Sequence, residues 1–122
     1  MNAHATHPLD RATRLVRNAD DSLTGRTDPA YANMVGPFGG VTAATMLNAA
    51  LAHPKRLGDP VALTVNYAGP LADGEFRIDA APVRTNRSTQ HWSITASQGD
   101  GVTTTATAVF ALRRQTWSST ET

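Results

Sequence analysis

The sequence contains no cysteine, so disulfide bonds, thiolate metal sites and a cysteine nucleophile are excluded. Aromatic residues make up only 6% of the chain while apolar residues reach 40%, so we expect a core built mainly from Ala, Val and Leu. No apolar run approaches the roughly 20 residues that span a bilayer. The N-terminal stretch MNAHATHPLD has no apolar signal-peptide centre. These absences predict a cytoplasmic protein with no membrane partner.

A strong excess of charge of either sign is also missing. Lys and Arg number 11 and Asp and Glu number 10, which gives a formal net charge of +1 and argues against a nucleic-acid partner. At 122 residues, the chain is long enough for one domain with a buried core. We expect this domain over residues 12–114, with a disordered tail at 1–11 and another tail at 115–122. The first tail holds His4 and His7, which we expect to be solvated, so we expect no metal and no cofactor.

The stretch Pro37–Ala52, PFGGVTAATMLNAALA, predicts a central helix that starts from a Gly-Gly turn. The helix ends before Pro54, because a proline disfavours helical geometry in the residue that precedes it. On a helical wheel, one broad face is apolar and consists of Ala43, Ala44, Met46, Leu47, Ala50 and Leu51. Thr42, Thr45 and Asn48 line the other face, which is therefore predicted to be small and polar.

The two glycines at the start of this helix carry the first functional indication. Gly39 and Gly40 let a ligand approach the backbone closely, at the place where the first helix amides have no internal partner. The amides of Gly40 and Val41, together with the positive end of the helix dipole, suit a carbonyl oxygen or another negative group. The alternative is that the glycines only form a tight turn beneath the sheet.

Extended-chain signals surround the helix. Two short segments precede it, at Thr13–Asn18 and Leu23–Arg26, and four longer ones follow it, at Val61–Tyr67, Glu75–Arg84, Thr89–Ser97 and Val102–Arg113. In the later segments apolar residues alternate with Thr, Ser and Ala, so one face of each strand packs on the helix. The four strands follow one another directly. We therefore predict an α+β domain with one helix against an antiparallel, meandering sheet of about five strands.

Four stretches in this order resemble the N-terminal hotdog domain of the acyl-CoA thioesterase-like family, over roughly Ala12 to Arg113. They are the Phe38-Gly39-Gly40 turn into the helix, the proline loop within Val61–Gly74, the arginine-containing turn Val83–Ser88 and the Gln-x-Gly hairpin Gln98–Gly101. The usual Gly-Arg of the turn is Asn86-Arg87 here, and Asn tolerates the left-handed geometry that Gly would supply. The resemblance implies the hotdog fold, in which a sheet wraps one long helix, and acyl-CoA as substrate or ligand.

The resemblance also bears on assembly. Many members of this family are tandem hotdogs about twice this length, whose water-activating residues (an Asp, a Thr or Ser, and a Gln) lie largely in the C-terminal hotdog. This chain contains one hotdog. Either it pairs with itself or a partner, or it is the non-catalytic half of something longer. Because hotdog sites form between two protomers, we expect a homodimer or a higher assembly.

Thioester hydrolysis needs a group that polarises the carbonyl and a group that orients or deprotonates water. The amides of Gly40 and Val41 fit the first role, with Phe38 and Gly39 in the same substrate-binding turn. No Asp or Glu lies between Asp28 and Asp59, so the helix has no carboxylate. The candidates that remain for placing water are Thr45, Asn48 and Asn66, none of which can act as a base near neutral pH.

Several other polar residues have two interpretations. Arg87, with Arg84 nearby, is a candidate for holding the phosphates of coenzyme A, or it is a solvated turn arginine. Asn66 and Gln90 are either site residues or ordinary strand residues. His91 alternates with Trp92, so we expect it to face away from the helix as a surface histidine.

The leading hypothesis is an acyl-CoA thioesterase-like protein that binds an acyl thioester between protomers and hydrolyses it. The competing hypothesis is a non-hydrolytic acyl-CoA-binding or assembly module, equivalent to the inactive half of a tandem enzyme, and the missing helix carboxylate favours it. A hotdog dehydratase ranks last, because that chemistry usually uses a His, Asp or Glu at the helix start and none is present.

Overall fold

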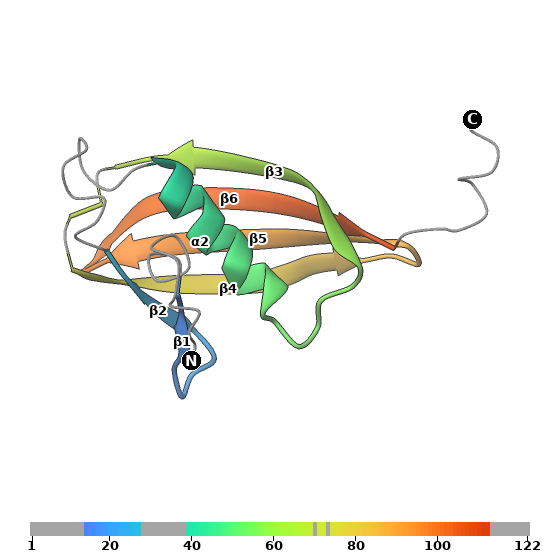
Figure 1. Ribbon diagram of the computed structural model, residues 1–122, viewed down its shortest axis with the longest axis horizontal. Coiled ribbons are helices and arrows are strands. Elements are labelled where there is room, and N and C mark those ends of the chain that lie inside the picture. Colours follow the sequence, from blue (N-terminus) through green and yellow to red (C-terminus); the bar gives the residue numbers. More distant parts are fainter. Residues whose placement is uncertain (1–13, 28–38, 70, 73, 113–122) are drawn as a thin grey trace, which may run out of the picture.

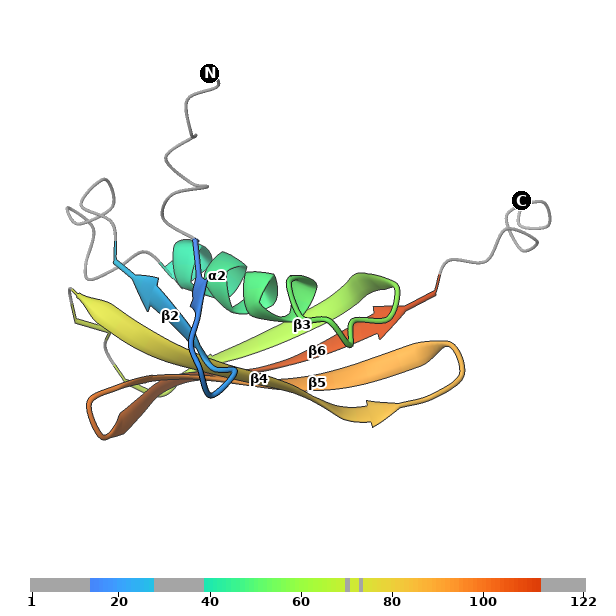
Figure 2. The same ribbon diagram turned by 90° about the horizontal axis from the view of Figure 1, so that it is seen from below.

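The structure, a computed structural model, describes residues 14–27, 39–69, 71–72 and 74–112. The predicted tails and Phe38 lie outside these residues, so the domain limits at 12 and 114 stay predictions. One helix, α2 (Gly39–Leu51), lies obliquely across one face of a six-stranded antiparallel sheet (Figures 1 and 2). The strands are β1 (Val16–Arg17), β2 (Leu23–Arg26), β3 (Asp59–Tyr67), β4 (Glu75–Thr85), β5 (Thr89–Gln98) and β6 (Gly101–Ala111). No helix in the described part is long and apolar enough to cross a membrane.

The order of the strands in the sheet is β1-β2-β4-β5-β6-β3. The predicted α+β class and the antiparallel sheet are confirmed, but the sheet has six strands rather than about five, and the predicted meander of four consecutive strands is wrong. Only β4, β5 and β6 form a meander, while β3 pairs with β6 and β2 takes the place beside β4. The connection from β3 to β4 passes the ends of β6 and β5, and the N–H groups of Ala68 and Gly69 donate to the Thr103 carbonyl at 2.9 and 3.0 Å.

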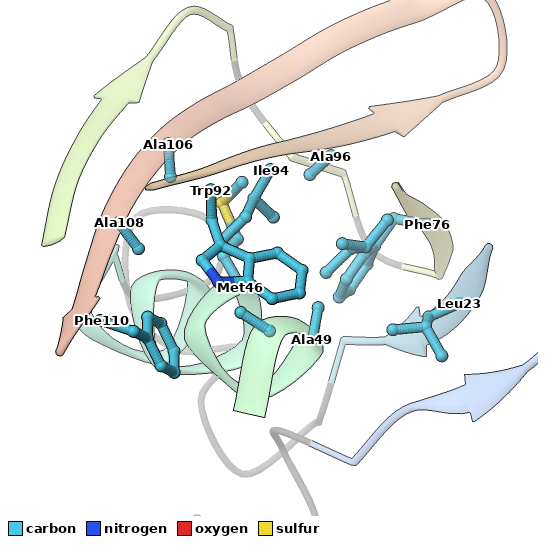
Figure 3. Packing of buried hydrophobic residues seen from close by; sticks show 12 residues of the cluster. Leu23, Met46, Ala49, Phe76, Trp92, Ile94, Ala96, Ala106, Ala108 and Phe110 are labelled. Carbon is cyan, nitrogen blue, oxygen red and sulfur yellow. The ribbon is translucent and has the colours of Figure 1, made fainter. Parts of the chain in front are cut away.

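The core lies between α2 and the sheet and follows the predicted strand alternation. Its sheet side consists of Leu23, Phe76, Ile78, Trp92, Ile94, Ala96, Ala106, Ala108 and Phe110, and its helix side of Met46, Ala49 and Ala50. Figure 3 shows Met46 and Ala49 directed at Trp92, with Phe76 and Phe110 to either side. Five alanines in this set keep the two layers close together. The prediction of a core built mainly from Ala, Val and Leu is otherwise wrong, because the set contains no valine and a single leucine but includes Phe76, Trp92 and Phe110.

The predicted faces of the helix need a correction. Thr42, Thr45 and Ala49 are buried and face the sheet, whereas Ala43, Ala44, Leu47 and Leu51 are only half-buried. The hydroxyl of Thr45 is satisfied within the helix, because it donates to the Val41 carbonyl one turn earlier at 2.8 Å. A threonine satisfied in this way can pack like a valine, so the helical wheel placed it on the wrong side.

Two valines within strands β3 and β4 are exposed, and the alternation placed the first of them, Val61, on the same face as Leu63 and Val65. Val61 and Val83 are 64% and 67% exposed, and each lies where the strand register shifts by one residue, between Pro60 and Ala62 and between Pro82 and Arg84. At a bulge the extra residue has no partner opposite and turns out of the alternation. Pro82, which lacks an N–H, lies next to one of these irregularities, as expected of a proline inside a sheet.

Candidate active site

The start of α2 lies at one end of the sheet, together with the end of β3, the start of β4 and the β5–β6 hairpin (Figures 1 and 2). The helix begins at Gly39, as predicted, and its first turn contains no acidic side chain. The first amides of a helix have no partner within the helix and form its positive end. Gly40 and Val41 therefore lie at the positive end of the helix, and no side chain of the first turn carries a negative charge.

The three candidates for placing water do not converge. Thr45 is 1% exposed beneath the helix, and its hydroxyl is already bound to Val41. Asn48 is half-buried one turn further along α2. Asn66 pairs with Thr105 across β3 and β6, whereas its neighbour Val65 pairs with the buried Ala106, so Asn66 lies on the sheet face away from the helix. Within one chain, Asn48 is the candidate that remains on the helix and accessible.

Arg87 lies at the opposite end of the molecule from Gly39 and Gly40. It belongs to the exposed turn between β4 and β5, in which the Asn86 N–H donates to the Thr89 carbonyl at 2.7 Å. The 11 residues of β4 lie between the helix-start end of the sheet and this turn, and at about 3.3 Å per residue they span roughly 35 Å. Among the described non-glycine residues, only Asp21 has a positive φ. Asn86 therefore does not adopt the left-handed geometry that the resemblance suggested for it. Its side-chain oxygen accepts a hydrogen bond from Arg84 Nε at 2.8 Å.

Gln90, which the sequence left undecided, is a buried structural residue. Its Oε1 accepts from the Leu57 amide and from Trp92 Nε1, at 2.9 and 2.8 Å. Its Nε2 donates to the Lys55 carbonyl and to Thr85 Oγ1, at 2.9 and 3.0 Å. The side chain thus fastens the segment after α2 to the sheet, at the end of the helix opposite to Gly39.

None of the described carboxylates lies on α2, and five of them are held in surface ion pairs with arginines. These pairs are Arg17–Asp21, Arg26–Glu75, Arg56–Asp59, Arg77–Asp20 and Arg77–Asp79, with distances of 3.9, 2.9, 2.9, 3.0 and 2.9 Å. The described residues also contain no cluster of three or more His, Asp or Glu side chains that could hold a metal. The described part of the chain therefore offers amides at the helix start but no acidic side chain on the helix beside them.

The two described histidines lie away from the helix start. His91 is exposed, as predicted. His53 follows the far end of α2, where its ring packs edge-on against Trp92 with centroids 4.9 Å apart and its Nδ1 accepts from the Lys55 amide at 3.1 Å. Burial lowers the pKa of the His53 imidazole, and the charges of Arg17 and Lys55 lower it further, against a smaller opposing effect of Asp21.

A single helix packed across one face of this antiparallel sheet, with an uncharged helix start at one end, defines a hotdog-fold domain. The chain belongs to the family of acyl-CoA thioesterase N-terminal domains, which it matches over residues 28–111. The predicted resemblance is thereby confirmed. No curated protein matches the chain.

Among solved structures, the chain is 56% identical to a hotdog-fold protein of unknown function from Alicyclobacillus acidocaldarius, with a TM-score of 0.87 over 97% of this chain and 44% of that one. A protein from Thermobifida fusca proposed to be a thioesterase II is 22% identical, with a TM-score of 0.78 over 87% and 40% of the two chains. A Bacillus halodurans protein whose crystal structure contains CoA is 17% identical, with a TM-score of 0.69 over 81% and 71%. The chain thus spans less than half of the first two proteins.

Proposed function

We propose that this domain binds acyl-CoA thioesters at the start of α2 and hydrolyses them together with a second hotdog unit. The observation that carries the proposal is the family membership combined with the first turn of α2, which contains two glycines and no acidic side chain. The amides of Gly40 and Val41 would hold the thioester oxygen as negative charge develops on it. The CoA present in the structurally similar Bacillus halodurans protein supports this ligand class.

A second hotdog unit would supply what α2 lacks. Asn48 can orient a water molecule but cannot accept its proton near neutral pH, and α2 has no carboxylate. A base on another unit, either a second copy of this chain or a second domain, would complete the site. The free edge of β3 supports such pairing, since Asp59 at its start is the only charged residue on this nine-residue edge strand.

An alternative role is a non-catalytic acyl-CoA-binding half of a larger assembly. The burial of Thr45 favours this role, because its hydroxyl is bound within the helix and is unavailable to water. Asn66 lies on the outer face of the sheet. Of the three candidates, this leaves Asn48 to place a water molecule on the helix side. In this role the amides at the helix start would still bind the thioester, and the chemistry would occur at a site on the other unit.

The test is hydrolysis of a panel of acyl-CoAs by the purified protein, with the released thiol detected continuously and binding measured in parallel by calorimetry. We expect turnover that falls about a hundredfold in Val41→Pro, which removes one amide donor at a helix position that tolerates proline. We expect a loss of about tenfold or more in Asn48→Ala. Ser93→Ala, on the outer face of β5 and away from the β3 edge, is the matched control.

The outcomes separate the two roles. Saturable binding that Val41→Pro weakens, without any turnover, would identify the non-catalytic half. Turnover that depends on Asn66 and not on Asn48 would move the site to the outer face of the sheet. If the protein neither hydrolyses nor binds acyl-CoA, the proposal is refuted.

A further inference from the structure

Two glutamines at the two ends of β5 each bind the backbone of a connection. Gln90 holds the segment after α2, as described above. Gln98 holds the connection between β3 and β4, because its Oε1 accepts from the Ala72 amide at 2.8 Å and its Nε2 donates to the Ala72 carbonyl at 2.7 Å. A longer contact joins Nε2 to the Glu75 carbonyl at 3.3 Å. The amide of Gln98 thus pairs with Ala72 as a neighbouring strand would.

The β3–β4 connection is held at every described position. Besides Ala72, the amides of Ala68 and Gly69 bind the Thr103 carbonyl, and Leu71 packs against the core. Gly74 exchanges two hydrogen bonds with Thr27, since its amide donates to Thr27 Oγ1 at 2.7 Å and its carbonyl accepts from the Thr27 amide at 2.9 Å. A segment outside the sheet needs such external partners for its backbone.

This connection lies at the same end of the sheet as the start of α2, as both views of the ribbon show (Figures 1 and 2). Gln90 lies at the other end, beside the segment after the helix. The two glutamines also differ in burial, since Gln90 is 2% exposed whereas Gln98 is half-buried at the hairpin. Loss of the Gln98 amide therefore releases the middle of one connection, at Ala72, and leaves the core intact.

We propose that Gln98 is a positioning residue that holds the β3–β4 connection as a fixed wall of the acyl-thioester site at the start of α2. The inference rests on the function proposed above. Gln98 does not touch the reacting atoms, and it acts through the backbone of Ala72. Its removal lets the connection move and weakens the binding of the thioester, while the amides of Gly40 and Val41 keep their geometry.

The experiment compares Gln98→Met with Gln90→Met, a matched pair in which a similar amide is removed at opposite ends of β5. For Gln98→Met we expect KM to rise about tenfold with kcat within about twofold, because two direct hydrogen bonds to the connection are lost. Hydrogen exchange at the Ala72 amide should accelerate. For Gln90→Met we expect the urea midpoint to fall while KM stays within about twofold of wild type.

A third variant, Gln98→Glu, adds a pH readout that a change in stability alone would not produce. When the new side chain is protonated, its O–H can donate to the Ala72 carbonyl in place of Nε2. When it is ionised, two acceptors face each other. We therefore expect KM near the wild-type value in acid and a rise in KM as pH increases through the pKa of the new carboxyl.

Three results would overturn the inference. If the wild type is active, an unchanged KM in Gln98→Met would overturn the inference. An equal rise of KM in Gln90→Met would also overturn it, because it would indicate that loss of stability anywhere in the fold raises KM. If the wild type binds acyl-CoA without turnover, the dissociation constant replaces KM in the same comparison. A wild type that neither binds nor hydrolyses acyl-CoA would refute the proposed function and this inference with it.

Discussion

Gln90 and His53 form a small polar cluster around the indole of Trp92, beneath the segment that follows α2. Trp92 Nε1 donates to Gln90, and the His53 ring contacts the Trp92 ring. Arg56 adds a cation–π contact with Phe110, 5.9 Å from the ring centroid. The described ion pairs involve side chains that are a third or more exposed, and such pairs add little to stability. Buried amide hydrogen bonds therefore fix this end of the fold more firmly than charges do.

The half-buried His53 predicts a pH dependence of stability. The pKa of His53 is lowered in the folded protein, whereas in the unfolded chain it is about 6.5. Below that pH the unfolded chain takes up a proton that the folded protein resists. The contribution of His53 to stability is therefore present above about pH 6.5 and is lost as pH falls through the lower, folded-state pKa. Urea unfolding at about pH 8 and about pH 5 measures this loss.

Two variants that do not titrate isolate the effect of His53. His53→Phe keeps an aromatic ring beside Trp92, and His53→Gln keeps an acceptor for the Lys55 amide. Both should lose less stability between the two pH values than wild type does. An identical loss in all three proteins would assign the pH dependence to other groups.

At the level of elements, β2 depends on a glycine that lies opposite an aromatic residue. Gly25 pairs with Phe76 of β4, and a Cβ on Gly25 would lie 2.5 Å from two ring atoms of Phe76. The ring therefore covers the glycine backbone and seals the core where the short hairpin of β1 and β2 joins the sheet. A side chain at position 25 must displace Phe76.

We expect Gly25→Ala to lower the free energy of unfolding by about 1–3 kcal/mol, the usual cost of overpacking a core. Gly101→Ala is the control, because the nearest atom to its Cβ would be 3.9 Å away, and its effect should stay within about 0.5 kcal/mol. Chemical denaturation measures both variants. The double variant Gly25→Ala with Phe76→Leu should recover part of the loss, and failure to do so would place the strain elsewhere.

The whole molecule presents two surfaces that suit a partner. One is the free edge of β3, and the other is the half-buried side of α2, which includes Ala43, Leu47 and Leu51 on a helix without any charged residue. Natural edge strands usually carry charges or other devices that block pairing, and β3 has no charge after Asp59. We infer that a second hotdog unit covers both surfaces.

Sedimentation of the purified protein tests this assembly. At micromolar concentration we expect a dimer or a higher species. Ala62→Lys combined with Thr64→Lys should shift it toward monomer, because like charges along paired edges repel. Both positions are exposed in the single chain, so the domain itself should remain folded. Lysines at the exposed Ala81 and Val83, which lie two residues apart on the interior strand β4, provide the control. A monomeric wild type would contradict the inference.

The sequence by itself determined the elements and the inward faces of strands β4 and β5. Phe76, Ile78, Trp92 and Ile94 alternate with polar neighbours, and such alternation can only bury one face of a strand. The two glycines and the proline after the helix likewise marked its ends, because backbone geometry at these residues is set locally. Local patterns and the motif order were enough to predict both the α+β class and the family.

The tertiary structure alone decided which elements are neighbours and which polar residues are free. The place of β3 beside β6 depends on a connection held by Thr103 and Gln98, residues about 30 positions away. The burial of Thr45 and Gln90 depends on partners that satisfy their polar atoms, and sequence alternation does not record partners. Whether a polar side chain serves the core or a ligand is set by these distant contacts, because each hydrogen bond satisfied inside the fold is unavailable to a substrate.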